Sequence, residues 1–154
     1  MSKVETSAEL ANSILKDLFY KILSIQEKSI EDITEGSLTI TEIHVLEIVG
    51  DGKADNISSA ASELGVMVSS ASICIDRMVK KGLLDRERDP VDRRVVHISL
   101  TEKGRIYYYA HQKFHREMVR AVLEDFELDK HPELVQILTS LRDFFLNKYK
   151  EYLK

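Results

Sequence analysis

The chain has a single cysteine, no apolar run long enough to span a membrane and no low-complexity segment. Because Cys74 stands alone, no intrachain disulfide framework can form, as is usual in a reducing cytoplasm. A membrane span needs about 20 apolar residues in a row, and the N-terminus does not resemble a signal peptide. We therefore expect a cytoplasmic chain without a membrane partner, whose 154 residues form one domain, residues 1–154.

The sequence also lacks a recognisable catalytic set. It has no nucleophile–base–orienter pattern, no glycine-rich phosphate loop and no paired acid motif. We therefore expect neither an enzyme nor a cofactor. Cys74 is no better as a redox sensor, because it flanks a predicted buried stripe, where cysteine usually behaves as a small apolar side chain.

An excess of positive charge is missing as well, since the formal net charge is −4. The distribution of charge matters more than the total, because a charged partner responds to the local field of a surface. Residues 77–105 contain nine Lys and Arg against five Asp and Glu, which gives this stretch a charge of +4. This basic stretch is the candidate surface for a nucleic acid.

The basic stretch lies in a segment whose pattern predicts a winged helix-turn-helix. A short helix over 59–64 ends at Gly65, and a second helix over 68–81 ends at Gly82. The second helix carries one apolar stripe, formed by Ala71, Ile75 and Met78. Two strands then follow, over 84–88 and 94–100, and they are joined by a turn that contains arginines.

The predicted fold class is mainly α (α+β), with the winged helix-turn-helix over 39–104 as a DNA-binding lobe. Terminal helices over 7–33 and 132–153 carry more apolar surface than such a small lobe needs. We expect them to pair with the same helices of a second copy, and a monomer that folds them back is the alternative. A homodimer would place two wings on a palindrome whose half-sites lie about 34 Å apart.

The second helix and the wing carry the candidate DNA contacts. Hydroxyls suit base edges or phosphates, Ile73 suits a thymine methyl, and Arg94, with Arg93, suits the minor groove. Asp92 would orient an arginine, either Arg77 or Arg94. The alternative for the helix is an ordinary solvated face. The candidate residues are Ser69, Ser70, Ser72, Ile73, Arg77, Lys80, Arg86, Arg88, Asp92, Arg93 and Arg94.

Three stretches resemble the MarR family of bacterial transcription regulators. They are 76–83 (DRMVKKGL), 89–94 (DPVDRR) and 100–104 (LTEKG). Within the family, 92–97 (DRRVVH) and 114–119 (FHREMV) are most similar to the repressors of fatty-acid biosynthesis genes. The resemblance implies a homodimeric repressor of double-stranded DNA, tuned by a small ligand or by acyl chains on acyl carrier protein. Met67 departs from the family pattern, because Ser or Thr usually caps this helix.

An effector cleft is expected between three predicted helices: the one over 7–33, one that 39–42 can cap and Gly50 closes, and a long one from Thr101 to about Phe126. The residues predicted to line it are Phe19, Ile22, His44, Tyr108, His111 and His115. The histidines are interpreted there as hydrogen-bonding groups, with no metal.

A metal site is the alternative for these histidines. His111 and His115 are four residues apart on one helix, which suits metal ligation, and His44 would lie nearby. Glu42 or Glu117 would complete the ligand shell, as in a zinc-responsive MarR-type regulator of metal uptake. A protein-interaction module that does not bind DNA is a third hypothesis.

Overall fold

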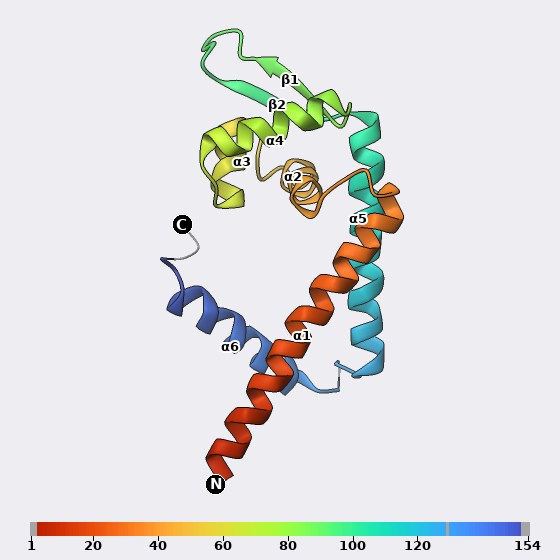
Figure 1. Ribbon diagram of the computed structural model, residues 1–154, viewed down its shortest axis with the longest axis vertical. Coiled ribbons are helices and arrows are strands. Elements are labelled where there is room, and N and C mark those ends of the chain that lie inside the picture. Colours follow the sequence, from red (N-terminus) through yellow and green to blue (C-terminus); the bar gives the residue numbers. More distant parts are fainter. Residues whose placement is uncertain (1–2, 129, 152–154) are drawn as a thin grey trace. The chain divides into compact units, whose positions relative to one another are not determined.

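The computed structural model describes residues 3–128 and 130–151, and in this part of the chain six helices accompany one two-stranded sheet (Figure 1). The helices are α1 (Lys3–Thr34), α2 (Ile40–Gly50), α3 (Ile57–Leu64), α4 (Val68–Lys80), α5 (Glu102–Asp125) and α6 (Pro132–Lys148). The strands are β1 (Leu84–Arg88) and β2 (Val96–Leu100). The mainly helical fold class is thereby confirmed. The chain divides into two compact units, Met1–Ile40 and Thr41–Lys154, each described by itself.

The first unit consists of α1 and the turn that follows it. Thr34 ends the helix by donating its hydroxyl to the Ile30 carbonyl at 2.7 Å. The same oxygen accepts the Leu38 amide at 3.4 Å, and Gly36 takes a left-handed φ of +70°. These contacts turn the chain sharply out of the helix. The predicted helix over 7–33 is confirmed and begins earlier, at Lys3.

In the second unit, α3 and α4 form the predicted helix-turn-helix, with a bend of 111° between them. The Asn56 side chain accepts the Ser59 amide at 2.9 Å, and Ser59 Oγ in turn accepts the Asn56 amide at 3.1 Å. This capping box starts α3 at Ile57, two residues before the predicted start. Gly65, with a φ of +64°, ends the helix and allows the tight turn into α4.

The apolar core of the second unit is built from short segments that all lie near the helix-turn-helix. Its fully buried side chains come from α2, α3, α4, the α4–β1 junction and β2. They include Ile43, Val45, Leu46, Ala60, Ala61, Ala71, Ile75, Met78, Leu83, Leu84 and Ile98.

The two strands form an antiparallel hairpin in which Leu84 faces Leu100 and Arg88 faces Val96. The prediction that the second strand starts at Arg94 is wrong, because β2 starts at Val96. The Asp92 carbonyl accepts the Val95 amide at 2.9 Å, and its carboxylate accepts the Arg94 amide at 3.0 Å. The turn therefore uses the two amides that a longer strand would need.

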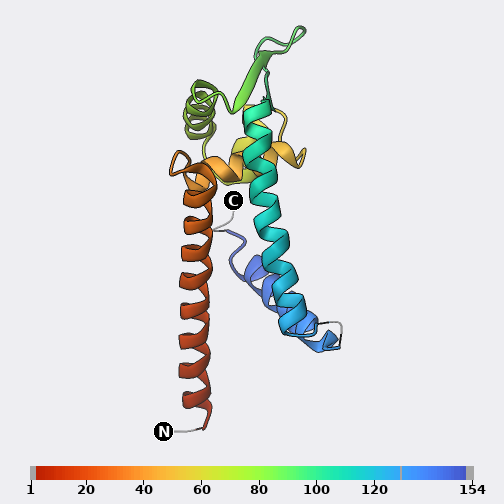
Figure 2. The same ribbon diagram turned by 90° about the vertical axis from the view of Figure 1, so that its right-hand side faces the viewer.

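The helix α5 begins directly after β2 and leads the chain away from the hairpin (Figure 2). Thr101 caps it by accepting the Gly104 amide at 3.0 Å. A Cβ at Gly104 would lie 2.1 Å from the Leu83 carbonyl oxygen, so only glycine allows this close packing.

The helix α6 starts with Pro132 in its first turn and ends at Lys148. It contains no buried residue. The predicted end at 153 is not reached by α6, and Tyr152 and Leu153 lie outside the described residues.

Over the described ranges 3–128 and 130–151, no individual helix has the length and apolar character of a membrane span. Only the bent pair α3–α4, taken together, passes on length and composition.

Candidate nucleic-acid interface

The helix α4 presents to solvent the face that the sequence predicts. Ala71, Ile75 and Met78 are buried, and the opposite side of the helix is open. Ile73 is 63% exposed on this open side. The predicted residues exposed on this face are Ser69, Ser70, Ile73, Arg77 and Lys80, and Ser72 is half-buried at its edge.

The first turn of α4 begins without a side-chain cap. Met67 occupies the N-cap position and makes no side-chain cap hydrogen bond, as its departure from the family pattern implied. The amide groups of a helix N-terminus favour anions, because they carry partial positive charge and point out along the axis. The start of α4 therefore suits a phosphate group.

The C-terminal end of α4 is held by a buried ion pair that the sequence analysis missed. Lys81 Nζ donates to both carboxylate oxygens of Glu42 at 2.8 Å, and Glu42 is only 1% exposed. Lys103 Nζ donates to the Lys81 carbonyl at 3.1 Å. The ion pair therefore ties α4 to α2. The available signal was an acidic residue beside the apolar run that starts at Ile43.

A second ion pair connects the hairpin to α4. Arg86, on β1, contacts the carboxylate of Asp76, on α4, through its guanidinium. Arg86 was predicted as a phosphate contact, and the structure shows it fixing the hairpin against the helix. Arg88 and Arg93 are exposed further out on the hairpin. The Arg86–Asp76 pair therefore joins the hairpin, with its exposed arginines, to α4.

The tip of the hairpin holds Arg94 in solvent. Arg94 Nε lies 3.3 Å from Asp92 Oδ1, and the Arg94 side chain is 94% exposed. Of the two arginines predicted as partners of Asp92, the structure shows Arg94. The Asp92 carboxylate restricts the conformations of the Arg94 guanidinium but leaves it exposed, which suits insertion into the minor groove of DNA.

The turn of the hairpin is organised by Asp89, which the sequence analysis did not single out. Its Oδ1 accepts the amides of Val91 and Asp92, each at 2.8 Å, and its Oδ2 accepts from His97 Nε2 at 2.9 Å. The His97 bond first, and then the two amides, lower the pKa of Asp89 from 3.8 to about 2. The same bond raises the pKa of His97 above 6.5.

Four of the six predicted effector residues lie on α2 and α5 in the second unit. The Tyr108 hydroxyl donates to Asp51 at 2.8 Å. The Tyr108 ring packs so closely on Gly50 that a Cβ added to Gly50 would lie only 2.6 Å from ring carbons. The hydrogen bond to Asp51 raises the pKa of Tyr108 and lowers that of Asp51. The other two residues, Phe19 and Ile22, lie exposed on α1 in the first unit.

His111 is completely buried, and its Nε2 lies 3.0 Å from the Nε2 of His115. Burial, and then the charges of His115 and His44, lower the pKa of His111 to about 4. His111 is therefore a neutral imidazole at neutral pH.

The histidines do not form the set that the sequence alternative names. Among the described residues, the ligand atoms that converge belong to Glu47, His111 and His115, so Glu47 stands where His44 was expected. The expected carboxylates lie elsewhere. Glu42 pairs with Lys81, and Glu117 pairs with Lys113 at 3.7 Å.

Residues 38–96, which contain the helix-turn-helix and most of the hairpin, match the MarR family. The chain is 27% identical over 134 residues to the uncharacterized HTH-type transcriptional regulator YkoM of Bacillus subtilis (strain 168), covering 87% of each protein. It is 30% identical over 94 residues to the transcriptional repressor MdtR of the same strain, covering 61% of this chain and 59% of that protein. It also resembles Streptococcus pneumoniae FabT, solved in complex with DNA, with 27% identity and a TM-score of 0.83, covering 91% of this chain and 98% of that one.

The helix-turn-helix and most of the hairpin thus match the MarR family, and the chain as a whole resembles FabT in its fold. Its relatives are described as transcriptional regulators, which agrees with the expectation that the chain is not an enzyme. In this helix-turn-helix, α4 is the second helix and is called the recognition helix below, and the β1–β2 hairpin is called the wing.

Proposed function

We propose that the chain is a MarR-type regulator that binds a palindromic operator as a homodimer and represses transcription. The recognition helix enters the major groove with Ser69, Ser70, Ser72 and Ile73 toward the bases. The wing reaches the adjacent minor groove with Arg94. Phosphates on either side meet the remaining predicted basic residues, which are Arg77, Lys80, Arg86, Arg88 and Arg93.

One observation carries this proposal more than any other: an almost fully exposed arginine at the tip of a hairpin that is ion-paired to the recognition helix. Arg94 is 94% exposed, and the Arg86–Asp76 pair fixes the orientation of the hairpin relative to α4. A flexible surface arginine would give little affinity, because its ordering would offset the contact. A fixed wing presents Arg94 at a constant distance from the recognition helix.

We predict that Arg94→Ala weakens binding to an A·T-rich palindromic duplex and reduces the salt dependence of binding. Each lost phosphate-type contact lowers the slope of log affinity against log salt by about one in each subunit. A mobility-shift titration at several salt concentrations measures both quantities. Arg120→Ala is the matched control, because it removes the same charge from an ion pair with Glu124 on α5. Undiminished affinity in Arg94→Ala would contradict the wing assignment.

We propose further that acyl chains on acyl carrier protein tune this regulator and that its targets are fatty-acid biosynthesis genes. The resemblance to FabT supports this proposal. A ligand shifts DNA affinity only through its preference for one dimer geometry, commonly by about 1–3 kcal/mol. Adding acyl carrier protein with and without an acyl chain to the same titration tests it. Tighter operator binding with the acylated form alone is the expected result.

The same mobility-shift titration tests the alternative hypothesis of a protein-interaction module that does not bind DNA. Such a module would show no salt-sensitive binding to duplexes of any composition.

A further inference from the structure

Three metal-ligating atoms from two helices converge beside the pocket described below, and the proposed DNA contacts do not include them. His111 Nε2 and His115 Nε2 are 3.0 Å apart on successive turns of α5. Glu47 Oε1, from α2, lies 3.5 Å from the first nitrogen and 4.0 Å from the second.

We propose that Glu47, His111 and His115 bind one divalent transition-metal ion, for which Zn²⁺ is the best match. This ion would join α2 to α5. The proposal concerns metal binding by the chain itself and does not depend on operator recognition.

The spacing of the three atoms fits a tetrahedral ion. Two ligands at the usual Zn–N and Zn–O distances, about 2.1 Å, are about 3.4 Å apart at a tetrahedral angle. The observed separations of 3.0, 3.5 and 4.0 Å lie on both sides of that value, so small side-chain shifts suffice. Two imidazoles and one carboxylate with a free fourth position are a common open zinc site, whereas Mg²⁺ and Ca²⁺ prefer oxygen ligands.

A proton shared by the two rings explains the geometry less completely. One N–H···N hydrogen bond accounts for the contact between His111 and His115. It does not account for the position of the Glu47 carboxylate, which would then bond to neither ring nitrogen. The other ring nitrogen of His111, Nδ1, is buried and has no hydrogen-bond partner among the described residues. His111 is therefore not held in place by a polar network of its own, and a metal ion would engage all three converging atoms.

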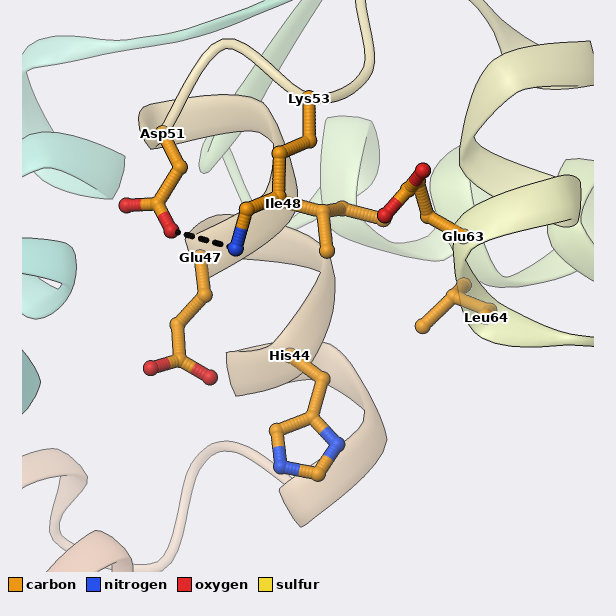
Figure 3. Close-up of a pocket in the computed structure, with 7 residues that line it drawn as sticks. All are labelled: His44, Glu47, Ile48, Asp51, Lys53, Glu63 and Leu64. Carbon is orange, nitrogen blue, oxygen red and sulfur yellow. Dashed lines mark ion pairs between the residues drawn. The ribbon is translucent and has the colours of Figure 1, made fainter. Parts of the chain in front are cut away.

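One of the three ligands, Glu47, lines a pocket of about 290 Å³ (Figure 3). Glu47 lines this pocket together with Asp51 and Glu63, against a single cation, Lys53. Lys53 pairs with Asp51 at 3.1 Å. A pocket with more carboxylates than ammonium groups raises the local concentration of cations, which favours entry of the ion.

His44 lines the same pocket one turn before Glu47 but does not belong to the converging set. The structure thus distinguishes two possible sets of metal ligands, which share His111 and His115. One contains Glu47 and the other contains His44, and substitution of either residue distinguishes them.

Metal-free full-length protein is titrated with Zn²⁺ against a chromophoric chelator, and with Co²⁺ while its visible absorption is followed. We expect one ion per chain in the wild type, and loss of binding in Glu47→Gln and in His115→Gln. Binding should persist in His44→Gln. It should also persist in His131→Gln, which removes an exposed histidine that pairs with Glu133 at 3.0 Å. His111 is not substituted, because its complete burial makes misfolding the expected consequence.

Thermal unfolding followed by circular dichroism separates lost binding from lost folding. Zn²⁺ should raise the midpoint of the wild type and of His131→Gln, since a ligand that binds only the folded state stabilises it. It should leave the midpoint of a folded Glu47→Gln protein unchanged. Binding that survives both Glu47→Gln and His115→Gln, or that is lost in His44→Gln, overturns the proposed site. All these measurements are made without DNA.

Discussion

At the scale of single residues, the buried Glu42 differs most from its sequence interpretation, which considered it only as a ligand in the alternative metal site. A carboxylate that is 1% exposed loses nearly all its hydration, and this costs several kcal/mol unless a cation replaces the water. Lys81 does so with two hydrogen bonds of 2.8 Å. Because Lys81 follows the last residue of the recognition helix, this pair sets where that helix ends relative to α2.

We predict that Lys81→Met destabilises the protein by about 2–3 kcal/mol. Removal of one partner from a buried ion pair usually costs about 3–5 kcal/mol, and the partial exposure of Lys81 lowers the expected value. Chemical denaturation measures the free energy of unfolding. Lys80→Met is the control, because Lys80 is the exposed neighbour on the recognition helix. Equal stabilities of the two variants would show that the pair contributes nothing.

At the scale of secondary structure, the wing depends on a turn held by side chains more than by its strands. Each strand has only five residues, and a two-stranded hairpin of this size is marginal alone. The Asp89 carboxylate supplies acceptors to two turn amides and to His97 on β2. Asp76 and Arg86 then fix the hairpin to the recognition helix. Three carboxylates, those of Asp89, Asp92 and Asp76, thus help to order the wing.

The His97–Asp89 bond makes the wing pH-dependent. The raised pKa of His97 stabilises the folded state fully below 6.5, and this contribution disappears as the pH rises through the raised value. The lowered pKa of Asp89 stabilises the folded state above 3.8, and this contribution disappears as the pH falls toward about 2. The bond is therefore strongest between these two limits, in mildly acidic solution.

We predict that His97→Gln speeds amide exchange at Val91 and Asp92 at mildly acidic pH. Above the raised pKa of His97, where its imidazole is neutral in the wild type too, the two proteins should differ much less. Hydrogen exchange followed by NMR, corrected for the intrinsic pH dependence, measures the ratio at both pH values. A ratio that does not change with pH would contradict a charged His97.

At the scale of the whole molecule, α1 and α6 each carry many exposed apolar side chains. They follow helical spacing on α1, and α6 has no buried residue at all. On α1 they include Leu10, Ile14, Leu18, Ile22 and Ile25, and on α6 Val135, Ile137, Leu138, Leu141 and Phe144. A second copy that covers these faces accounts for their composition, and it agrees with the proposed two-fold operator.

We predict that the protein sediments at about twice its chain mass of 17.7 kDa and that Ile14→Glu with Leu18→Glu shifts it toward the monomer. Burying two carboxylates in an apolar interface without cations opposes association. Sedimentation equilibrium measures the mass. Lys16→Glu, on the other side of α1, adds a carboxylate outside the apolar row and should leave the dimer intact. A wild type that stays monomeric in dilute solution would refute the dimer, and with it the two-wing mode of binding.

The sequence by itself determined the local elements and the outward face of α4, because helical periodicity, Gly65, Gly82 and the DPVDRR turn act over a few residues. It also placed Arg94 at the wing tip, since Asp92 and Arg94 are close in the chain. Only the tertiary structure decided the pairs that join distant segments. Glu42 meets Lys81, Asp89 meets His97, and Glu47 joins the two α5 histidines in place of His44. These partners depend on how α2, the wing and α5 pack together. The spacing of residues within one helix or strand does not determine how that element packs against another.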